Sequence, residues 1–182
     1  MSNNLSTNAP TVRKGPLRAF ASPDFTLFWL GSLLSITSFF LLIIARGWLV
    51  LEMTNSPFMV TAVAGAAQLP SLVLSIPGGI LADRFDRRLI CLIGESVNCL
   101  AMLALAILVA TQNVEMWHIF VTGIINGTSF ALTFPARAAI TPNLVPREDI
   151  ANGVALASTM FSGAQFIGPA LAGILLASFA LS

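Results

Sequence analysis

The chain has 182 residues, of which 56% are hydrophobic and only 9% are charged, and its mean hydropathy is +0.86. Soluble domains carry about 25% charged residues, so this composition excludes an ordinary soluble globular fold and predicts an integral membrane protein. The net charge is +1 and the sequence has no basic stripe or basic domain, which excludes nucleic acid as a partner.

The first 24 residues differ in composition from the rest of the chain. Residues 1–10 are rich in Ser, Asn and Thr, and Arg13, Lys14 and Arg18 follow. This pattern predicts a polar and basic tail that is solvated and cytoplasmic. The apolar run after it is longer than the core of a signal peptide and lacks a small-x-small cleavage site at the right distance. We therefore expect the first helix to stay in the mature protein.

Five apolar segments follow the tail, and short polar connections separate them. Each is long enough to cross a bilayer as a tilted helix, since about 20 apolar residues span the hydrocarbon core. We expect an all-α, polytopic membrane protein with a tail over 1–24 and about five transmembrane helices over 25–182. The predicted helices cover about 25–50, 58–82, 89–110, 116–139 and 150–181.

Positive charge is distributed unevenly among the connections. Eight of the nine Lys and Arg residues lie in the tail, in the second connection or near the fourth, which share one side of the membrane. Cytoplasmic segments are enriched in Lys and Arg, so we expect a multi-pass protein of the inner (plasma) membrane with a cytoplasmic N-terminus. Asn55 and Asn113 would then face the outside, and Arg46 is the one basic residue placed toward that side.

The second connection carries the most specific sequence motif of the chain. The stretch from Gly79 to Arg88 reads G-I-L-A-D-R-F-D-R-R. It resembles the motif G-x-L-A-D-R-x-G-R-R of the major facilitator superfamily, which lies between the second and third helices of that fold. Asp86 stands where Gly is commonest in the motif.

Two further stretches support the resemblance. Residues 135–137 and 142–149 are similar to the enterobactin-exporter-like branch of the superfamily, the transmembrane secretion effectors. The fifth apolar segment resembles the G-P-x-x-G-G motif of antiporters, with Ala172 in place of one Gly. Its matching residues are Gly163, Gly168, Pro169 and Gly173.

This resemblance implies a fold of twelve helices in two six-helix halves, of which the chain would supply an incomplete N-terminal bundle. It implies secondary active transport by alternating access. We expect export of a small amphiphilic substrate, siderophore-like or drug-like, through proton-coupled antiport together with a missing C-terminal half. A truncated membrane protein without transport activity, or an assembly partner, is the alternative. We expect no enzyme activity, cofactor or metal, since no catalytic constellation is present and His118 has no second ligand at suitable spacing.

The charged connection is the first candidate functional element. The resemblance implies that it latches against the second half of the transporter and so acts as a cytoplasmic gate. Charges that only set the topology would explain the arginines equally well. The candidate gate residues are Gly79, Asp83, Arg84, Arg87 and Arg88.

Two charged residues are predicted to lie inside the membrane near its cytoplasmic side. Glu95 is about 9 Å along its helix from Leu89, and Arg137 is about 7.5 Å before Pro142. Because the two helices are antiparallel neighbours, these charges lie at similar depth, and we expect them to pair. Asn98 is an alternative partner for Glu95, and a proton-carrying role for Glu95 is an alternative function.

Arg46 lies near the other end of the first helix, about 30 Å along it from Phe25. That position predicts a side chain that extends to the outer interface. Binding of an anionic substrate is the alternative.

Small and polar residues inside the segments suggest how the helices pack and where a cavity lies. Gly123 with Gly127, and Ala164 with Gly168 and Ala172, have the spacing that lets helices approach closely. The resemblance implies that the first and fourth helices line the cavity, although interhelical hydrogen bonding is the alternative role for polar residues there. The candidate lining residues are Thr37, Ser38, Gln68, Asn126, Thr128, Ser129 and Gln165.

Overall fold

The computed structural model describes residues 17–180, except for the side chains of Ser75, Ala82, Asp83, Phe179 and Ala180. This part of the chain is helical and contains no strand. The long helices are α1 (Pro23–Thr54), α2 (Pro57–Arg84), α3 (Arg87–Ala110), α4 (Met116–Ile140) and α5 (Ile150–Ala180). The short 3-10 helices are η1 (Arg18–Ala21), η2 (Thr141–Asn143) and η3 (Arg147–Asp149). All five long helices are long and apolar enough to cross a membrane, which confirms the predicted fold class.

Local sequence explains where the helices begin and end. Pro23 and Pro57 are the first residues of α1 and α2, where the missing N–H costs no hydrogen bond. Asn55 ends α1 in the left-handed conformation, with φ of 50°, and Asn tolerates this better than most residues. Glu115 and His118 cap α4 reciprocally through side chain and backbone. These turns keep the connections short, so successive helices are antiparallel.

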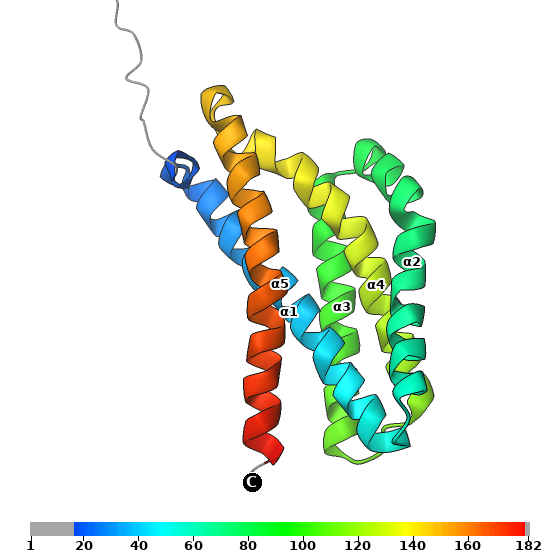
Figure 1. Ribbon diagram of the computed structural model, residues 1–182. Helices are drawn as coiled ribbons and strands as arrows, with labels where there is room; N and C mark the ends of the chain where they lie inside the picture. The colour runs from blue at the N-terminus through cyan, green and yellow to red at the C-terminus, as the bar shows by residue number, and fades with distance from the viewer. Residues whose placement is uncertain (1–16, 181–182) are drawn as a thin grey trace, which may run out of the picture.

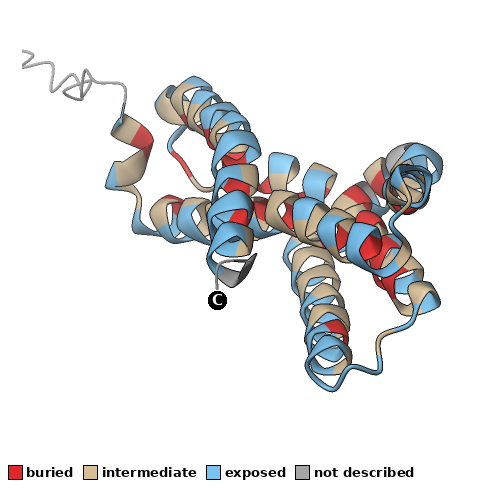
Figure 2. Ribbon diagram, turned by 60° about the horizontal axis from the view of Figure 1, so that its bottom comes forward, coloured by how far each residue is buried: buried red, intermediate tan, exposed pale blue. Residues whose placement is uncertain are grey.

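Helix α4 is the centre of the bundle (Figure 1). It packs against α2 on one side and α3 on the other, while α5 lies along α1 and α1 also contacts α2. Buried residues lie where the helices face one another (Figure 2). Ten residues of α4 are buried, whereas Leu105 is the only buried residue of α3 in the described part of the chain. Helix α3 therefore lies at the periphery.

Two glycines allow the closest helix contacts. A Cβ atom at Gly127 of α4 would lie 1.8 Å from the carbonyl oxygen of Ala67 on α2. One at Gly168 of α5 would lie 2.8 Å from the carbonyl oxygen of Thr37 on α1. Neither position accepts a larger residue without a shift of backbone. The small-residue spacing therefore predicted both interfaces correctly.

The segment before α1 packs against the bundle. Arg18 Nε lies 2.9 Å from a carboxylate oxygen of Asp149, and the backbone N–H of Ala19 donates to the side-chain oxygen of Asn152 at 3.0 Å. Ala19 and Phe25 are buried. The expectation of a solvated tail is therefore wrong for the short helix η1, because η1 packs against α1 and α5. Residues 1–16 lie outside the described part.

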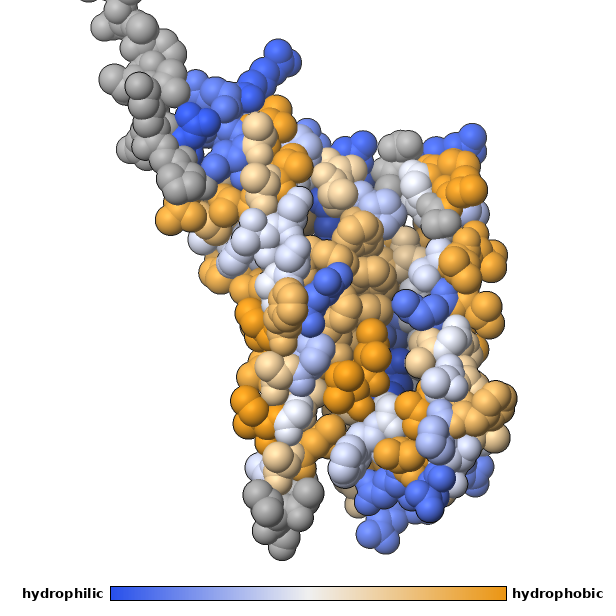
Figure 3. All heavy atoms as spheres, in the orientation of Figure 1, coloured by the Kyte–Doolittle hydropathy of each residue, from blue (hydrophilic) through white to orange (hydrophobic). Residues whose placement is uncertain are grey.

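Apolar side chains dominate the middle of the molecular surface (Figure 3). Polar residues gather at the two ends of the visible face. Large exposed hydrophobic residues include Leu72 and Ile76 of α2 and Phe166 of α5. So extensive an apolar surface suits a protein that lies in lipid.

Candidate functional site

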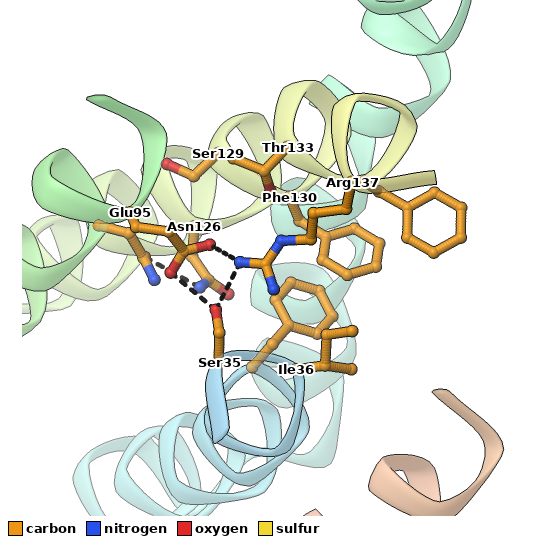
Figure 4. Close-up of a pocket in the computed structure, with 11 residues that line it drawn as sticks. Ser35, Ile36, Glu95, Asn126, Ser129, Phe130, Thr133 and Arg137 are labelled. Atoms are coloured by element: carbon orange, nitrogen blue, oxygen red, sulfur yellow. Dashed lines mark hydrogen bonds and ion pairs between the residues drawn. The ribbon is translucent and has the colours of Figure 1, made fainter. Parts of the chain in front are cut away.

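A polar network joins three helices within their apolar spans (Figure 4). Arg137 of α4 forms an ion pair with Glu95 of α3 through Nη2 and Oε1. Ser35 of α1 donates a hydrogen bond to the other carboxylate oxygen of Glu95 at 2.7 Å and accepts one from Arg137 Nη2 at 2.9 Å. Nη1 of Arg137 also reaches the carbonyl oxygen of Ser32, at 3.5 Å. The predicted pairing of Glu95 with Arg137 is confirmed, and Ser35 is an additional member.

The environment of the pair is asymmetric. The side chain of Arg137 is 12% exposed and that of Glu95 is 37% exposed. Aromatic rings enclose one side, where Phe39 stacks on Phe130 with centroids 4.2 Å apart. On the other side the pair borders a cavity of about 650 Å³, whose lining also includes Asp24 and Arg88. The hollow directly beside the pair is only about 20 Å³, which is too small for an organic substrate.

Helix α3 approaches α4 closely at this level because of a glycine. A Cβ atom at Gly94 would lie 2.6 Å from the Cγ2 of Thr133. One turn further along α3, Asn98 accepts a hydrogen bond from the amide of Asn126 at 3.0 Å. Asn98 is therefore occupied with α4, and the alternative in which it partners Glu95 is wrong.

The candidate gate connection is a tight turn between α2 and α3. Phe85 and Asp86 alone separate the two helices, and the Asp86 carboxylate accepts a hydrogen bond from the backbone N–H of Arg88 at 2.8 Å. The residue that departs from the family motif thus caps α3. Arg87 donates to the carbonyl oxygen of Ala139 at 3.0 Å, near the end of α4. Arg84 and Arg88 are exposed.

Asp83 and Gly79, the two remaining candidate gate residues, make no contact that the structure describes at this turn. The side chain of Asp83 lies outside the described residues. Gly79 lies in the last part of α2, and a Cβ atom there would meet no atom within 4 Å. The gating role of this connection stays a prediction.

The candidate lining residues divide into two groups. Asn126 and Ser129 are buried and border the small hollow beside the ion pair, and Asn126 with Gln68 borders a second cavity between α1, α2 and α4. The others do not line either cavity, and Ser38 instead donates to a backbone carbonyl of its own helix. This second group consists of Thr37, Ser38, Thr128 and Gln165.

The antiporter-like motif of α5 has one closely packed member. Gly168 is buried against α1, whereas Cβ atoms at Gly163 and Gly173 would meet no atom within 4 Å. Pro169 lies inside α5 next to this contact. The motif therefore sets how near α5 comes to α1, and any further role of it stays a prediction.

Arg46 differs from the expected position at the outer interface. Its side chain is buried, with 4% exposure, and points into the bundle beside Gly123 of α4. Within the described part of the chain, its Nε and Nη2 atoms have no hydrogen-bond partner. The expectation of a side chain extended to the interface is therefore wrong. The sequence predicts how far along α1 the residue lies, but the direction of its side chain decides its burial.

The comparisons with known proteins identify a family and several relatives. Residues 14–181 match the family described as transmembrane secretion effector. The chain is 30% identical over 159 residues to the enterobactin exporter of Salmonella typhimurium, which is 86% of this chain and 38% of that protein. It is 26% identical over 151 residues to macrolide efflux protein A of Streptococcus pyogenes, 83% of this chain and 37% of that protein.

Another relative is an uncharacterized transporter of the major facilitator type from Bacillus subtilis. It is 28% identical over 130 residues, 71% of this chain and 30% of the relative. The chain thus spans between 30% and 38% of the length of these curated relatives. No solved structure matches it.

Proposed function

Because the chain belongs to the transmembrane secretion effector family of major facilitator transporters, we propose that it supplies five helices of an exporter for small amphiphilic molecules. The family and the relatives are transporters rather than enzymes. Two relatives are named as an enterobactin exporter and a macrolide efflux protein, so an organic molecule of small size is the proposed substrate. The similarity covers little more than a third of these relatives, so the transport cycle requires the remaining part of a longer protein.

The network of Glu95, Arg137 and Ser35 supports a mechanism by alternating access. Transporters of this kind work largely by rigid-body rocking of one helix bundle against another. The ion pair joins α3 to α4, and the hydroxyl group of Ser35 joins α1 to both charged residues. These bonds keep the bundle rigid while it moves. The enclosure of Arg137 and its bonds to Glu95, Ser35 and the carbonyl oxygen of Ser32 support this structural role.

We assign the gate to the turn between α2 and α3, which faces the cytoplasm in the proposed topology. Arg87 bonds the turn to the end of α4, and the exposed Arg84 and Arg88 are free to contact the other half of the transporter in this proposal. Charge-assisted bonds of this kind form in one conformation and break in the other, which gives a switch between two states.

Proton-coupled antiport is the proposed energy source, and the antiporter-like motif of α5 supports it. Glu95 is a poor candidate for the proton carrier, because its carboxylate is already bonded to Arg137 and Ser35.

Transport by a full-length parent protein in proteoliposomes tests the proposal. Under an imposed proton gradient we expect flux of a macrolide or a catecholate siderophore that collapses when a protonophore removes the gradient. The purified 182-residue chain should give no substrate-specific flux above empty liposomes. Flux through this chain alone, or a parent protein that transports none of a broad panel of amphiphiles, would overturn the proposal.

A further inference from the structure

Arg46 is a buried cation for which the described chain provides no counterion. Its side chain leaves α1 eight residues before the end of that helix at Thr54, about 12 Å along the axis. It points toward α4, where a Cβ atom at Gly123 would lie 3.4 Å from Nη1. Glycine at that position therefore leaves room for the guanidinium between the two helices.

The burial of this group is energetically unfavourable without an anion. A guanidinium remains protonated at any physiological pH, so it cannot become neutral as a buried lysine can. Charged side chains inside membrane proteins are costly and are paired or face a functional cavity. Nε and Nη2 are both without a hydrogen-bond partner in the described residues, although each is a donor. The site therefore holds unused donors on a group of fixed positive charge.

Arg46 lines a cavity of about 450 Å³. This volume is in the range of pockets that bind small organic molecules. The Nε and Nη2 atoms of Arg46 are buried, so the side chain must turn toward the cavity to offer these donors to a ligand. Among the described residues that line the cavity, Arg46 is the only charged one. Gln68 and Asn126 are the two that carry a side-chain amide. The remaining wall is mainly apolar and aromatic, with Phe39 and Trp48 from α1.

We propose that Arg46 and this cavity form a binding site for an organic anion with an apolar, ring-containing body. The guanidinium would hold the carboxylate, sulfonate or phenolate group by charge-assisted hydrogen bonds, and the apolar wall would hold the ring system. As a statement about the molecules that are exported, this inference rests on the proposed function. The binding itself is a property of the chain and is measured without transport.

A pair of probes with the same ring system separates charge from hydrophobicity. Anilinonaphthalene sulfonate is an anion, and phenylnaphthylamine is its uncharged counterpart. Each is titrated by fluorescence into the purified 182-residue chain in detergent, with empty micelles subtracted. We expect Arg46→Gln to weaken binding of the anion about tenfold or more and to leave the uncharged probe unchanged, because only the anion uses the guanidinium.

Two variants control for loss of charge and for loss of fold. Arg46→Lys keeps a cation and should retain part of the affinity for the anion. Arg147→Gln removes an exposed arginine in η3 and should leave both probes unchanged. Equal binding of the anion by wild type and Arg46→Gln, or an equal loss in Arg147→Gln, would overturn the proposal.

A chemical measurement on the unaltered chain covers the case in which Arg46→Gln fails to fold. Phenylglyoxal modifies arginine side chains, and mass spectrometry locates the modified residues. We expect the anion, and not the uncharged probe, to slow modification of Arg46, with no effect on Arg147. Absence of that protection would refute the site. Such a result would leave the exporter proposal intact, because that proposal is judged by flux through the longer protein.

Discussion

Glu95 on α3 and Arg137 on α4 pair across 42 residues of sequence, and the hydroxyl group of Ser35 on α1 bonds to both. The three side chains come from three different helices, and the whole of α2 separates α1 from α3 in the sequence. Their contact therefore fixes the relative rotation of these helices, which apolar packing alone leaves less specific.

Removal of either charge should destabilise the bundle. We expect Glu95→Gln and Arg137→Gln each to lower the free energy of unfolding by about 2 kcal/mol, because each strands the opposite charge in a partly buried site. The double variant should lose about 1 kcal/mol less than the sum of the single losses. Unfolding by sodium dodecyl sulfate in mixed micelles measures this, with Arg147→Gln as an exposed control. Additive losses would show that the pair carries no coupling energy.

Glycine at the helix contacts should be replaceable only where space exists. Gly127→Ala and Gly168→Ala place a methyl group against backbone carbonyl oxygens, so each should reduce stability by about 2 kcal/mol. Gly163→Ala meets no atom within 4 Å and should be neutral or stabilising, since alanine favours helix. Thermal unfolding of the three variants in one detergent compares them. Similar melting of Gly163→Ala and Gly127→Ala would contradict the packing of α4 on α2.

The cap of α3 should matter more than the identity of the motif residue. Asp86→Ala removes the acceptor for the N–H of Arg88 and should cost about 1 kcal/mol. Asp86→Asn keeps an acceptor, and Asp86→Gly restores the commonest residue of the motif, so both should cost only a few tenths of a kcal/mol. Hydrogen exchange at the first turn of α3 reports the loss locally. Unchanged exchange in Asp86→Ala would mean that the side-chain cap is not formed in solution.

The topology can be tested by labelling single cysteines. In a chain with Cys91 and Cys99 replaced by Ser, we expect Asn113→Cys to react with an impermeant maleimide added to intact cells. Arg84→Cys should react only after permeabilisation, because the distribution of positive charge predicts a cytoplasmic turn between α2 and α3. Both positions are exposed, so accessibility does not bias the comparison. Labelling of Arg84→Cys in intact cells would reverse the proposed orientation.

The helices themselves were predictable because their apolar runs are long and their turns carry Pro and Asn. Predicted ends agree with the observed ones within a few residues, and the largest difference lies at the end of α1. The apolar run weakens at Glu52, but the backbone stays helical to Thr54, because the helix ends only where Asn55 adopts the left-handed conformation. Side-chain hydropathy therefore placed the end of α1 too early, because the backbone conformation of the capping residue decides where the helix ends.

The sequence predicted how far along its helix each site residue lies, but not the direction in which its side chain points. The Glu95–Arg137 pair followed from equal depths on antiparallel neighbours. Ser35 was missed because the sequence does not show which side of α1 faces α3. Arg46 was placed correctly along its helix, but its burial depends on the space beside Gly123, a contact between residues far apart in sequence. Its isolation from the other basic residues was the one signal in the sequence that marked it.

The ion pair between Glu95 and Arg137 also affects how α3 and α4 are inserted into the membrane during synthesis. Glu95 leaves the ribosome 42 residues before Arg137, so α3 reaches the translocon with a carboxylate that has no cationic partner. An acidic residue in an isolated span opposes release into lipid, and pairing with the following helix relieves that opposition. We therefore expect α3 and α4 to enter the bilayer together as a hairpin. A nascent chain that ends before Arg137 should remain held at the translocon, with α3 still within reach of crosslinkers on the insertion machinery.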